Sequence, residues 1–326
     1  MTALRLVHNQ QDDRKDYINR SRLSEPKTDV AFVEFIQDTI DRKAKRRSES
    51  YVRNYRSLIA HLQNFAKAED VKLYTNSINE EFLDDFITYL EDQGLKLGYI
   101  KTILSLIKAM ARKAGNYGYA VDASYDDVTI RDEQPFGTFL SMNEITRIYY
   151  YQGLTKSQER IRDLFIVGCM TGLRYSDYST LSKDNFQGNF IVKMTKKTKK
   201  KVTIPLHDYV KEIYSKYEGE IPSKTIQHFN RRIKNIAKKI GIDNMITYNF
   251  TRGGQMVNIS RPKFELISSH TARRSFATNM YLTGRMKASE IMSITGHSTE
   301  KSFFKYVKIT QDDTAKQIAG DNFFRK

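Results

Sequence analysis

Apolar residues recur every three or four positions along most of this 326-residue chain and alternate along one short stretch. The first pattern places apolar side chains on one face of an α-helix, and the second places them on one face of a β-strand. The alternating residues are Phe190, Val192 and Met194, then Val202, Ile204 and Leu206. We therefore expect a mainly α protein with a small antiparallel β element, a hairpin with a basic turn.

Helical periodicity also predicts the domain organisation. Four helical segments are expected between Asp29 and about Gly118, and the fourth ends before Gly115. The stretch RDEQPFGTF contains a proline and a glycine between helical patterns, which is typical of a linker. Further helices are expected at 157–170, from Arg174, at 207–217, at 224–240 and from Ser269 onward, with a loop before Ser269. We predict an N-terminal tail at 1–28, a helical domain at 29–132, a linker at 133–139 and a second domain with a C-terminal tail at 140–326.

The fourth helical segment carries a polar stripe. Lys101, Ser105, Lys108 and Arg112 follow one another at spacings of four, three and four, away from the apolar face. Such a stripe suits contact with a phosphate backbone. An ordinary solvated helix face has the same pattern, so the stripe alone does not decide between the two.

Charge and cysteine content limit the class of protein. Lys and Arg outnumber Asp and Glu by 54 to 38, a net charge of +16, which favours an anionic partner: nucleic acid first, an anionic membrane surface second. The single cysteine, Cys169, excludes a disulfide framework and a cysteine-based zinc site and suits a reducing compartment. No apolar run approaches the ~18 residues that span a membrane, and acidic residues interrupt the N-terminus where a signal peptide is apolar. We expect a cytoplasmic protein.

Several chemically competent residues follow one another in the second half of the chain. They lie in the segments TGLRYSD, VKMTKKTKKKVTIPL, SSHTARRS and ITGHS and in the later KSFFKYVKIT. Taken singly, each has a structural explanation: an i, i+3 ion pair between Arg174 and Asp177, a solvated lysine turn, a hydrogen-bonded histidine, or a core tyrosine. The residues in question are Arg174, the hairpin lysines, His270, Arg273, His297 and Tyr306.

Taken together, these residues fit phosphoryl transfer from a DNA backbone. Guanidinium groups match the non-bridging oxygens of a phosphodiester with fork geometry. A tyrosine hydroxyl can act as a covalent nucleophile where nearby cations lower its pKa from about 10. A lysine on a flexible hairpin can supply a proton to the leaving oxygen, and imidazoles can shuttle protons or donate hydrogen bonds.

The ordered set of Arg174, a hairpin lysine, His270-x-x-Arg273, Gly296-His297 and Tyr306 resembles the tyrosine recombinases, the phage integrase family, and among them bacterial mobile-element integrases. The resemblance extends over roughly residues 29–310. It implies a four-helix SAM-like core DNA-binding domain followed by a tyrosine-recombinase catalytic domain.

The resemblance also implies a role for each residue. Tyr306 would attack the scissile phosphate and form a 3′-phosphotyrosyl bond. Arg174 and Arg273 would clamp the non-bridging oxygens, His270 would act as acid and base, and His297 would hydrogen-bond the phosphate.

Two further roles follow from the resemblance. Asp177 looks like the supporting carboxylate that holds the first arginine. The hairpin lysine precedes the V-x-I-P-L type strand, so Lys197 fits best, with Lys196 and Lys199 as alternatives that would also contact DNA. The stripe on the fourth helix gains weight as a DNA-facing surface.

The function implied is site-specific recombination through a Holliday junction, either integration and excision of a mobile element or DNA inversion. The partner would be double-stranded DNA with a specific recombination site, bound by a homotetramer on two sites that is monomeric without DNA and nucleoid-associated in the cytoplasm. No metal, other cofactor or membrane is required. Two alternatives are a non-catalytic DNA-binding protein of the same fold and a type IB-like topoisomerase.

Overall fold

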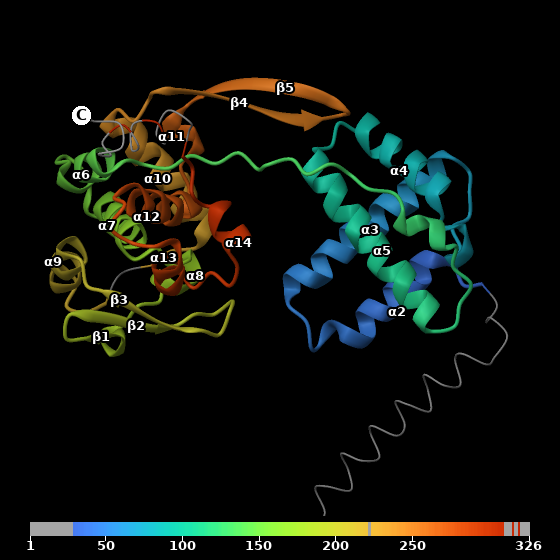
Figure 1. The fold of residues 1–326 in the computed structure, drawn as a ribbon, viewed down its shortest axis with the longest axis horizontal. Helices are drawn as coiled ribbons and strands as arrows, with labels where there is room; N and C mark the ends of the chain where they lie inside the picture. Colours follow the sequence, from blue (N-terminus) through green and yellow to red (C-terminus); the bar gives the residue numbers. More distant parts are fainter. Residues whose placement is uncertain (1–28, 221–222, 310–314, 316–318, 320–326) are drawn as a thin grey trace, which may run out of the picture. The chain divides into compact units, whose positions relative to one another are not determined.

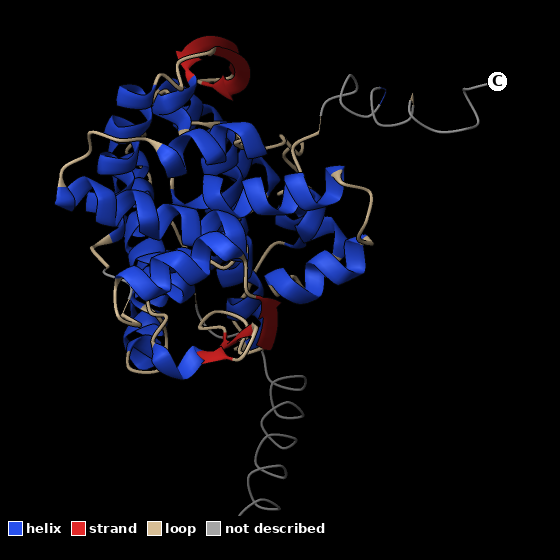
Figure 2. Ribbon diagram, turned by 90° about the vertical axis from the view of Figure 1, so that its left-hand side faces the viewer, coloured by secondary structure: helices blue, strands red, loops and turns tan. Residues whose placement is uncertain are grey.

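A computed structural model describes residues 29–220, 223–309, 315 and 319. The predicted tail at 1–28 and most of the segment after residue 309 lie outside the described residues. Helices predominate in the described part, and the strands form two small sheets, as Figure 2 shows, which confirms the expected fold class. The chain divides into two compact units, Met1–Pro135 with Asn249–Val257, and Phe136–Tyr248 with Asn258–Lys326 (Figure 1).

The first unit is a small helical domain. Two of its helices begin at residue types that favour a helix N-terminus, because the side chains of Ser48 and Asn79 accept hydrogen bonds from backbone amides in the first turn. The apolar faces of the helices meet in one core that includes Leu58, Leu62 and Phe86. Its described helices are α2 (Phe32–Ala44), α3 (Glu49–Ala68), η1 (Thr75–Ser77), α4 (Glu80–Asp92), α5 (Leu97–Asn116) and η2 (Ala123–Asp126).

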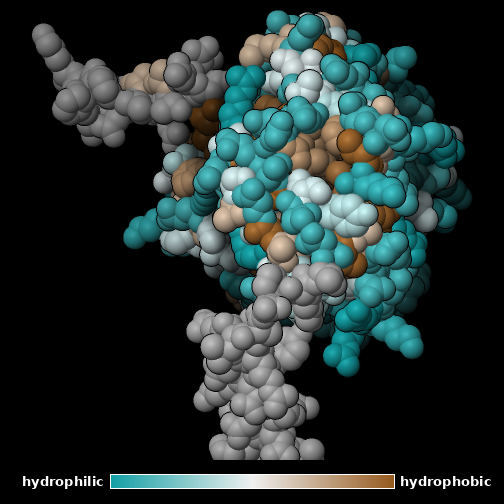
Figure 3. Space-filling model, turned by 90° about the vertical axis from the view of Figure 1, so that its right-hand side faces the viewer, coloured by the Kyte–Doolittle hydropathy of each residue, from teal (hydrophilic) through white to brown (hydrophobic). Residues whose placement is uncertain are grey.

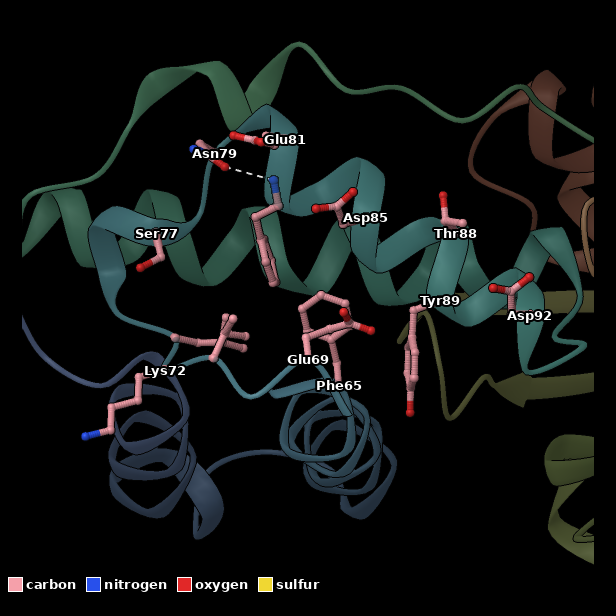
Figure 4. Close-up of a pocket in the computed structure, with 13 residues that line it drawn as sticks. Phe65, Glu69, Lys72, Ser77, Asn79, Glu81, Asp85, Thr88, Tyr89 and Asp92 are labelled. Atoms are coloured by element: carbon pink, nitrogen blue, oxygen red, sulfur yellow. Dashed lines mark hydrogen bonds between the residues drawn. The ribbon is translucent and has the colours of Figure 1, made fainter. Parts of the chain in front are cut away.

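One pocket of the first unit has an acidic lining. Glu81, Asp85 and Asp92 project from α4, and Glu69 faces them from the end of α3 (Figure 4). Like charges repel phosphate, so this pocket is poorly suited to contact with a nucleic acid backbone. Other surfaces of the protein are better suited to an anionic partner.

No described helix is long and apolar enough to cross a lipid bilayer. The face drawn in Figure 3 is mainly hydrophilic, with small hydrophobic patches between polar side chains.

The second unit is larger and mixed. Its core is a continuous cluster of apolar side chains that includes Phe165, Tyr178 and Phe229. Its described helices are α6 (Met142–Tyr150), α7 (Lys156–Thr171), α8 (Tyr175–Tyr178), η3 (Lys183–Asn185), α9 (Asp208–Lys216), α10 (Ile226–Ile240), α11 (Lys263–Leu266), α12 (Ser269–Leu282), α13 (Ala288–Thr295) and α14 (Glu300–Phe304). Its strands are β1 (Phe186–Gln187), β2 (Phe190–Met194), β3 (Lys201–Pro205), β4 (Met245–Arg252) and β5 (Gln255–Pro262). The turn between β4 and β5, with the adjoining ends of both strands (Asn249–Val257), belongs to the first unit.

Two helices at the centre of the second unit pack unusually closely. α7 is buried on all sides from Ile161 to Thr171, and it contacts α12 extensively. Gly168 makes this possible, because a Cβ there would lie 2.8 Å from the Tyr178 ring and 3.0 Å from the Cβ of Ala272. α7 ends at Gly172, whose φ of 64° is in the left-handed region that favours glycine.

The predicted hairpin is confirmed, but the expected apolar face of its first strand is wrong, because Ile191 is buried whereas Phe190 and Met194 are exposed. β2 and β3 pair in antiparallel register, with Ile191 opposite Ile204 and Val192 opposite Thr203, and β1 pairs with the other edge of β2. The lysine-rich segment forms the turn between β2 and β3. The turn is held by Thr195, whose hydroxyl accepts from the amide of Lys200 at 3.1 Å.

The prediction of a loop before Ser269 is wrong for residues 245–262, because they form the hairpin β4–β5. Gly253 and Gly254 make its turn with φ values of 57° and 68°, as a two-residue type I′ turn requires. Most of its side chains are exposed or half-buried, so neither strand has a fully buried apolar face. Within the first unit, Gly253 N donates to Leu95 O at 3.0 Å and Arg252 Nε donates to Gly94 O at 2.7 Å.

The close approach of α7 and α12 predicts that Gly168→Ala destabilises the second unit. Alanine normally favours a helix over glycine by about 1 kcal/mol, but here the added methyl group meets the buried Tyr178 ring, and overpacking costs about 1–3 kcal/mol. Thermal unfolding followed by circular dichroism measures the effect. The matched control is Gly98→Ala in α5, where nothing lies within 4 Å of the added Cβ. A Gly168→Ala protein as stable as wild type would contradict the predicted contact.

Candidate active site

Arg273 is the buried centre of the site. It is only 1% exposed, yet its guanidinium has no carboxylate in hydrogen-bond contact among the described residues. Instead Nη1 donates to the carbonyl of Gly172 at 2.7 Å and to the carbonyl of Thr295 at 2.6 Å. These carbonyls lie at the C-terminal ends of α7 and α13, where the helix dipole is negative and favours a cation. Burial and the charge of Arg174 lower the pKa of Arg273 to about 10, so it stays charged at neutral pH.

His297 is bound to Arg273. Nη2 of Arg273 donates to His297 Nε2 at 2.9 Å, and because a guanidinium has no acceptor, this nitrogen is unprotonated. Thr295 Oγ1 lies 2.7 Å from His297 Nδ1 and donates its own hydrogen to the carbonyl of Ile291, so Nδ1 is the protonated nitrogen. Burial, followed by the charges of Arg273 and Arg174, lowers the pKa of His297 to about 3. His297 is therefore a neutral residue whose Nε2 already has a partner in this structure.

Tyr306 lies beside this pair. Its ring centroid is 5.2 Å from Cζ of Arg273, 4.9 Å from the His297 ring and 6.3 Å from the His270 ring. α14 stops at Phe304, and Tyr306 follows in a turn. Phe303 is buried and anchors that turn, whereas Phe304 is 44% exposed. The Tyr306 ring is half-buried and remains accessible.

Arg174 and Asp177 lie where α8 begins. Arg174 precedes the first residue of α8 and is half-buried, and its buried Nη1 has no partner among the described residues. Asp177 is 0% exposed, and its Oδ1 accepts from the backbone amide of Lys196 at 2.8 Å. No hydrogen bond or ion pair joins Asp177 to Arg174 in the described part of the chain. Asp177 therefore tethers the lysine-rich turn to α8 in this structure.

The hairpin lysines differ in how they relate to the site. Lys196, Lys197 and Lys199 all have exposed side chains. Only the charge of Lys197 is among those that lower the pKa of His270, which places it electrostatically near that imidazole. Lys199 lies near the end of the turn, at a left-handed backbone position with φ of 53°.

His270 lies at the exposed edge of the site on α12. Desolvation lowers its pKa, with further lowering by the charges of Arg274, Arg273, Arg174 and Lys197. The imidazole is therefore neutral at pH 7 and free to accept a proton. The site as a whole carries a surplus of positive charge around a half-buried tyrosine, which suits an anionic substrate.

The polar stripe of the first unit is engaged within its own chain. Lys101 donates to the Ile130 carbonyl at 3.1 Å, Lys108 donates to the Val128 carbonyl at 2.6 Å, and Arg112 donates to Asp126 at 3.1 Å, so all three cations bind the segment 126–132. Ser105 donates to the carbonyl of Lys101 at 2.8 Å. Phosphate contact by Lys101 or Lys108 would require these bonds to exchange, whereas Arg112 stays largely exposed.

Sequence reasoning missed two parts of the site. Thr295 fixes the tautomer of His297, and Thr278 binds the backbone beside Tyr306, with its hydroxyl 3.4 Å from the Tyr306 carbonyl. Neither residue type has a chemical signature, and only the three-dimensional arrangement reveals them. Among the described residues, no three His, Cys, Asp or Glu side chains gather as metal ligands would.

Two family profiles match the sequence in succession. The phage integrase SAM-like domain matches residues 31–130, and the phage integrase family matches residues 138–312. The second match alone covers more than half of the chain. The chain belongs to the phage integrase family. It is a tyrosine site-specific recombinase with the two domains of this family.

Solved structures of integrases have the same fold. A lambda integrase tetramer bound to a Holliday junction is 17% identical, with a TM-score of 0.64 over 87% of this chain and 79% of that chain. The Tn1549 transposon integrase in complex with a circular intermediate DNA is 14% identical, with a TM-score of 0.68 over 88% of this chain and 98% of that chain. A search among curated proteins gave no match. At these identities the likeness concerns the fold, and the residues of the site must be judged by their own geometry.

The neutral state of His297 predicts a pH dependence for the stability of this integrase. An unfolded histidine has a pKa near 6.5, whereas His297 in the folded protein has a pKa of about 3. As pH falls below 6.5, the unfolded state gains a proton that the folded state does not bind, so the free energy of unfolding falls. From pH 7 to pH 5 this histidine alone lowers it by about 2 kcal/mol.

Urea unfolding at pH 7 and pH 5 measures this effect, with His297→Gln as the comparison. Glutamine keeps an acceptor for Arg273 but does not titrate, so its loss of stability on acidification is smaller than that of wild type by about 2 kcal/mol. Equal losses in the two proteins would show that His297 is not held neutral by the fold.

Proposed function

We propose that this recombinase cuts and rejoins DNA through a 3′-phosphotyrosyl intermediate formed by Tyr306. The observation that carries the proposal is the convergence of the Tyr306 ring on the buried pair of Arg273 and His297. Arg273 and Arg174 each have a buried guanidinium nitrogen without a partner among the described residues, Nε in one and Nη1 in the other. A phosphodiester has the anionic oxygens that such groups bind.

The proposed step conserves atoms and charge. The Tyr306 oxygen forms a bond to phosphorus while the bond from phosphorus to the 5′-oxygen breaks. Neutral His270 accepts the phenolic proton, and Lys197 supplies a proton to the leaving 5′-oxygen. Asp177 supports this arrangement through the lysine-rich turn. His297 donates a hydrogen bond to the phosphate once Nε2 has released Arg273 and carries the ring proton in place of Nδ1. The reverse step, with a 5′-hydroxyl of another strand as nucleophile, rejoins DNA and gives a Holliday junction.

The proposed substrate is double-stranded DNA carrying a specific recombination site, bound by a homotetramer on two sites. Lys196, Lys199 and the stripe of Lys101, Ser105, Lys108 and Arg112 are proposed as further contacts to the DNA backbone. The solved tetramer of lambda integrase on a Holliday junction supports the assembly by analogy of fold. We place the reaction in integration and excision of a mobile element or in DNA inversion.

Replacement of Tyr306 by phenylalanine is expected to abolish covalent attachment to DNA and to leave DNA binding intact. The measurement uses nicked suicide duplexes from DNA flanking the gene and detects adducts on a denaturing gel. The control is Tyr281→Phe, a half-buried tyrosine of the same unit outside the cluster, which is expected to form the adduct at the wild-type level. An adduct that persists in Tyr306→Phe would identify another nucleophile. Binding without any adduct in wild type would favour the non-catalytic alternative, and relaxation of site-free plasmids would favour a topoisomerase.

Lys197→Ala is expected to slow adduct formation by about 10²–10⁴-fold, the usual contribution of a general acid. A substrate whose 5′-bridging oxygen is replaced by sulfur should restore the rate, because a thiolate leaves without a proton. Lys196→Ala and Lys199→Ala serve as matched controls in the same turn and should show no such rescue. Rescue of Lys196→Ala or Lys199→Ala in place of Lys197→Ala would reassign the proton donor.

A further inference from the structure

Arg274 lies beside the site but outside the His270-x-x-Arg273 register. Its half-buried guanidinium rests on the backbone of Gly137, at the start of the second unit. A Cβ on residue 137 would lie 2.5 Å from Cζ and 2.7 Å from Nε of Arg274, so a side chain there would displace the guanidinium. Gly137 has no left-handed φ, so its backbone accepts other residues and the constraint is the space that Arg274 occupies.

The face of α12 that carries Arg274 also holds the chain around Tyr306. Thr278 is one helical turn after Arg274 and therefore shares its face. The Thr278 hydroxyl donates to the carbonyl of Tyr306 at 3.4 Å and accepts from the amide of Lys308 at 3.1 Å. Arg274 is thereby directed towards the segment that presents the nucleophile.

The segment after Gly137 is fixed on the same helix. Ser275 accepts from the amide of Leu140 at 2.8 Å, and Asn279 donates to the Leu140 carbonyl at 2.9 Å. Both bonds are buried, so the backbone on which Arg274 rests is held in place. Arg274 therefore lies in a fixed position between this segment and the Tyr306 turn.

The guanidinium of Arg274 has a cationic neighbourhood. In the described part of the chain it forms no hydrogen bond and no ion pair with a carboxylate. Desolvation, followed by the charge of Arg274, lowers the pKa values of His270 and Lys308. Burial lowers the pKa of Arg274 itself, and the nearby Tyr306 phenol acts in the opposite direction. A half-buried cation among other cations is unfavourable unless an anion joins it. An ordinary structural ion pair does not explain this arrangement.

We propose that Arg274 is a third phosphate-binding arginine of the site, seated by Gly137, which contacts a backbone phosphate of the cleaved strand at or directly beside the bond that Tyr306 attacks. The proposal rests on the proposed function and adds a residue to it. Arginine is suited to this role because its planar fork binds phosphate oxygens in pairs.

Arg274→Ala in the full chain is expected to slow adduct formation by about 10- to 100-fold, the loss of one charged hydrogen-bonding group. Duplexes with a charge-neutral methylphosphonate at the scissile position, or at one of the two adjacent positions, test the assignment. Where the phosphate bound by Arg274 is neutral, the difference between wild type and variant should disappear. Arg285→Ala, an exposed arginine of the same unit, is the control and should behave as wild type at every position.

Gly137→Ala tests the seat of the guanidinium. It should reproduce the defect of Arg274→Ala, and the double variant should be no slower than either single variant, because both changes remove the same interaction. An additive double variant, or a Gly137→Ala protein with wild-type rates, would overturn the positioning role. Loss of rate in Arg274→Ala without rescue at any methylphosphonate position would overturn the phosphate contact.

The proposal can fail separately from the proposed function. Wild-type adduct with an unaffected Arg274→Ala variant would overturn this inference alone. If wild type forms no adduct, the phosphate contact of Arg274 can still be tested by measuring DNA binding at several salt concentrations. Loss of one phosphate contact reduces the slope of log K against log salt by about 0.9, so Arg274→Ala should have the smaller slope. An unchanged slope in Arg274→Ala would overturn the contact in that case as well.

Discussion

The site depends on a buried guanidinium whose direct partners in the described chain are uncharged. Arg273 is held by the last carbonyls of α7 and α13, and these uncharged partners offset its desolvation, while no described carboxylate forms a hydrogen bond with it. Two helices must therefore end at one point. Gly172 allows this, because a Cβ there would lie 2.4 Å from the Phe276 ring and 2.9 Å from the Thr295 side chain. The contacts that bring the ends of α7 and α13 together in the core are therefore also the contacts that hold the charged Arg273 in the site.

The charge of Arg273 changes the ionisation of its neighbours. With Arg273 and Arg174 near it, His297 stays neutral and uses Nε2 to accept from the guanidinium instead of holding a second proton. His270 is also kept neutral by desolvation and by neighbouring cations, so it can act as a base. The positive charge thus resides on arginines and lysines, which do not titrate near pH 7, and the His270 imidazole stays neutral and able to accept a proton.

Most helices, the hairpin β2–β3 and the candidate site residues could be predicted from the sequence, because helical periodicity, strand alternation and short motifs are local features. The hairpin β4–β5 was missed although Ile246, Tyr248 and Phe250 alternate before Gly253-Gly254, since its mixed burial leaves no clean apolar face. The stripe at Lys101 could not be interpreted alone, because its partners lie in the segment 126–132, far along the chain. Periodicity predicts which residues share one face of a helix, but only the tertiary structure shows which residues pack against that face.

The surplus positive charge bears on the exposure of Tyr306, the proposed nucleophile. The Tyr306 turn is anchored by Phe303 below it and by Thr278 beside it, while the ring remains half-buried at the edge of the cationic cluster. In the proposed reaction, a phosphodiester entering there would meet guanidinium nitrogens that have no partner in the described part of the chain. Its binding would reduce the repulsion among these cations, and its negative charge would be stabilised further as charge develops during the reaction.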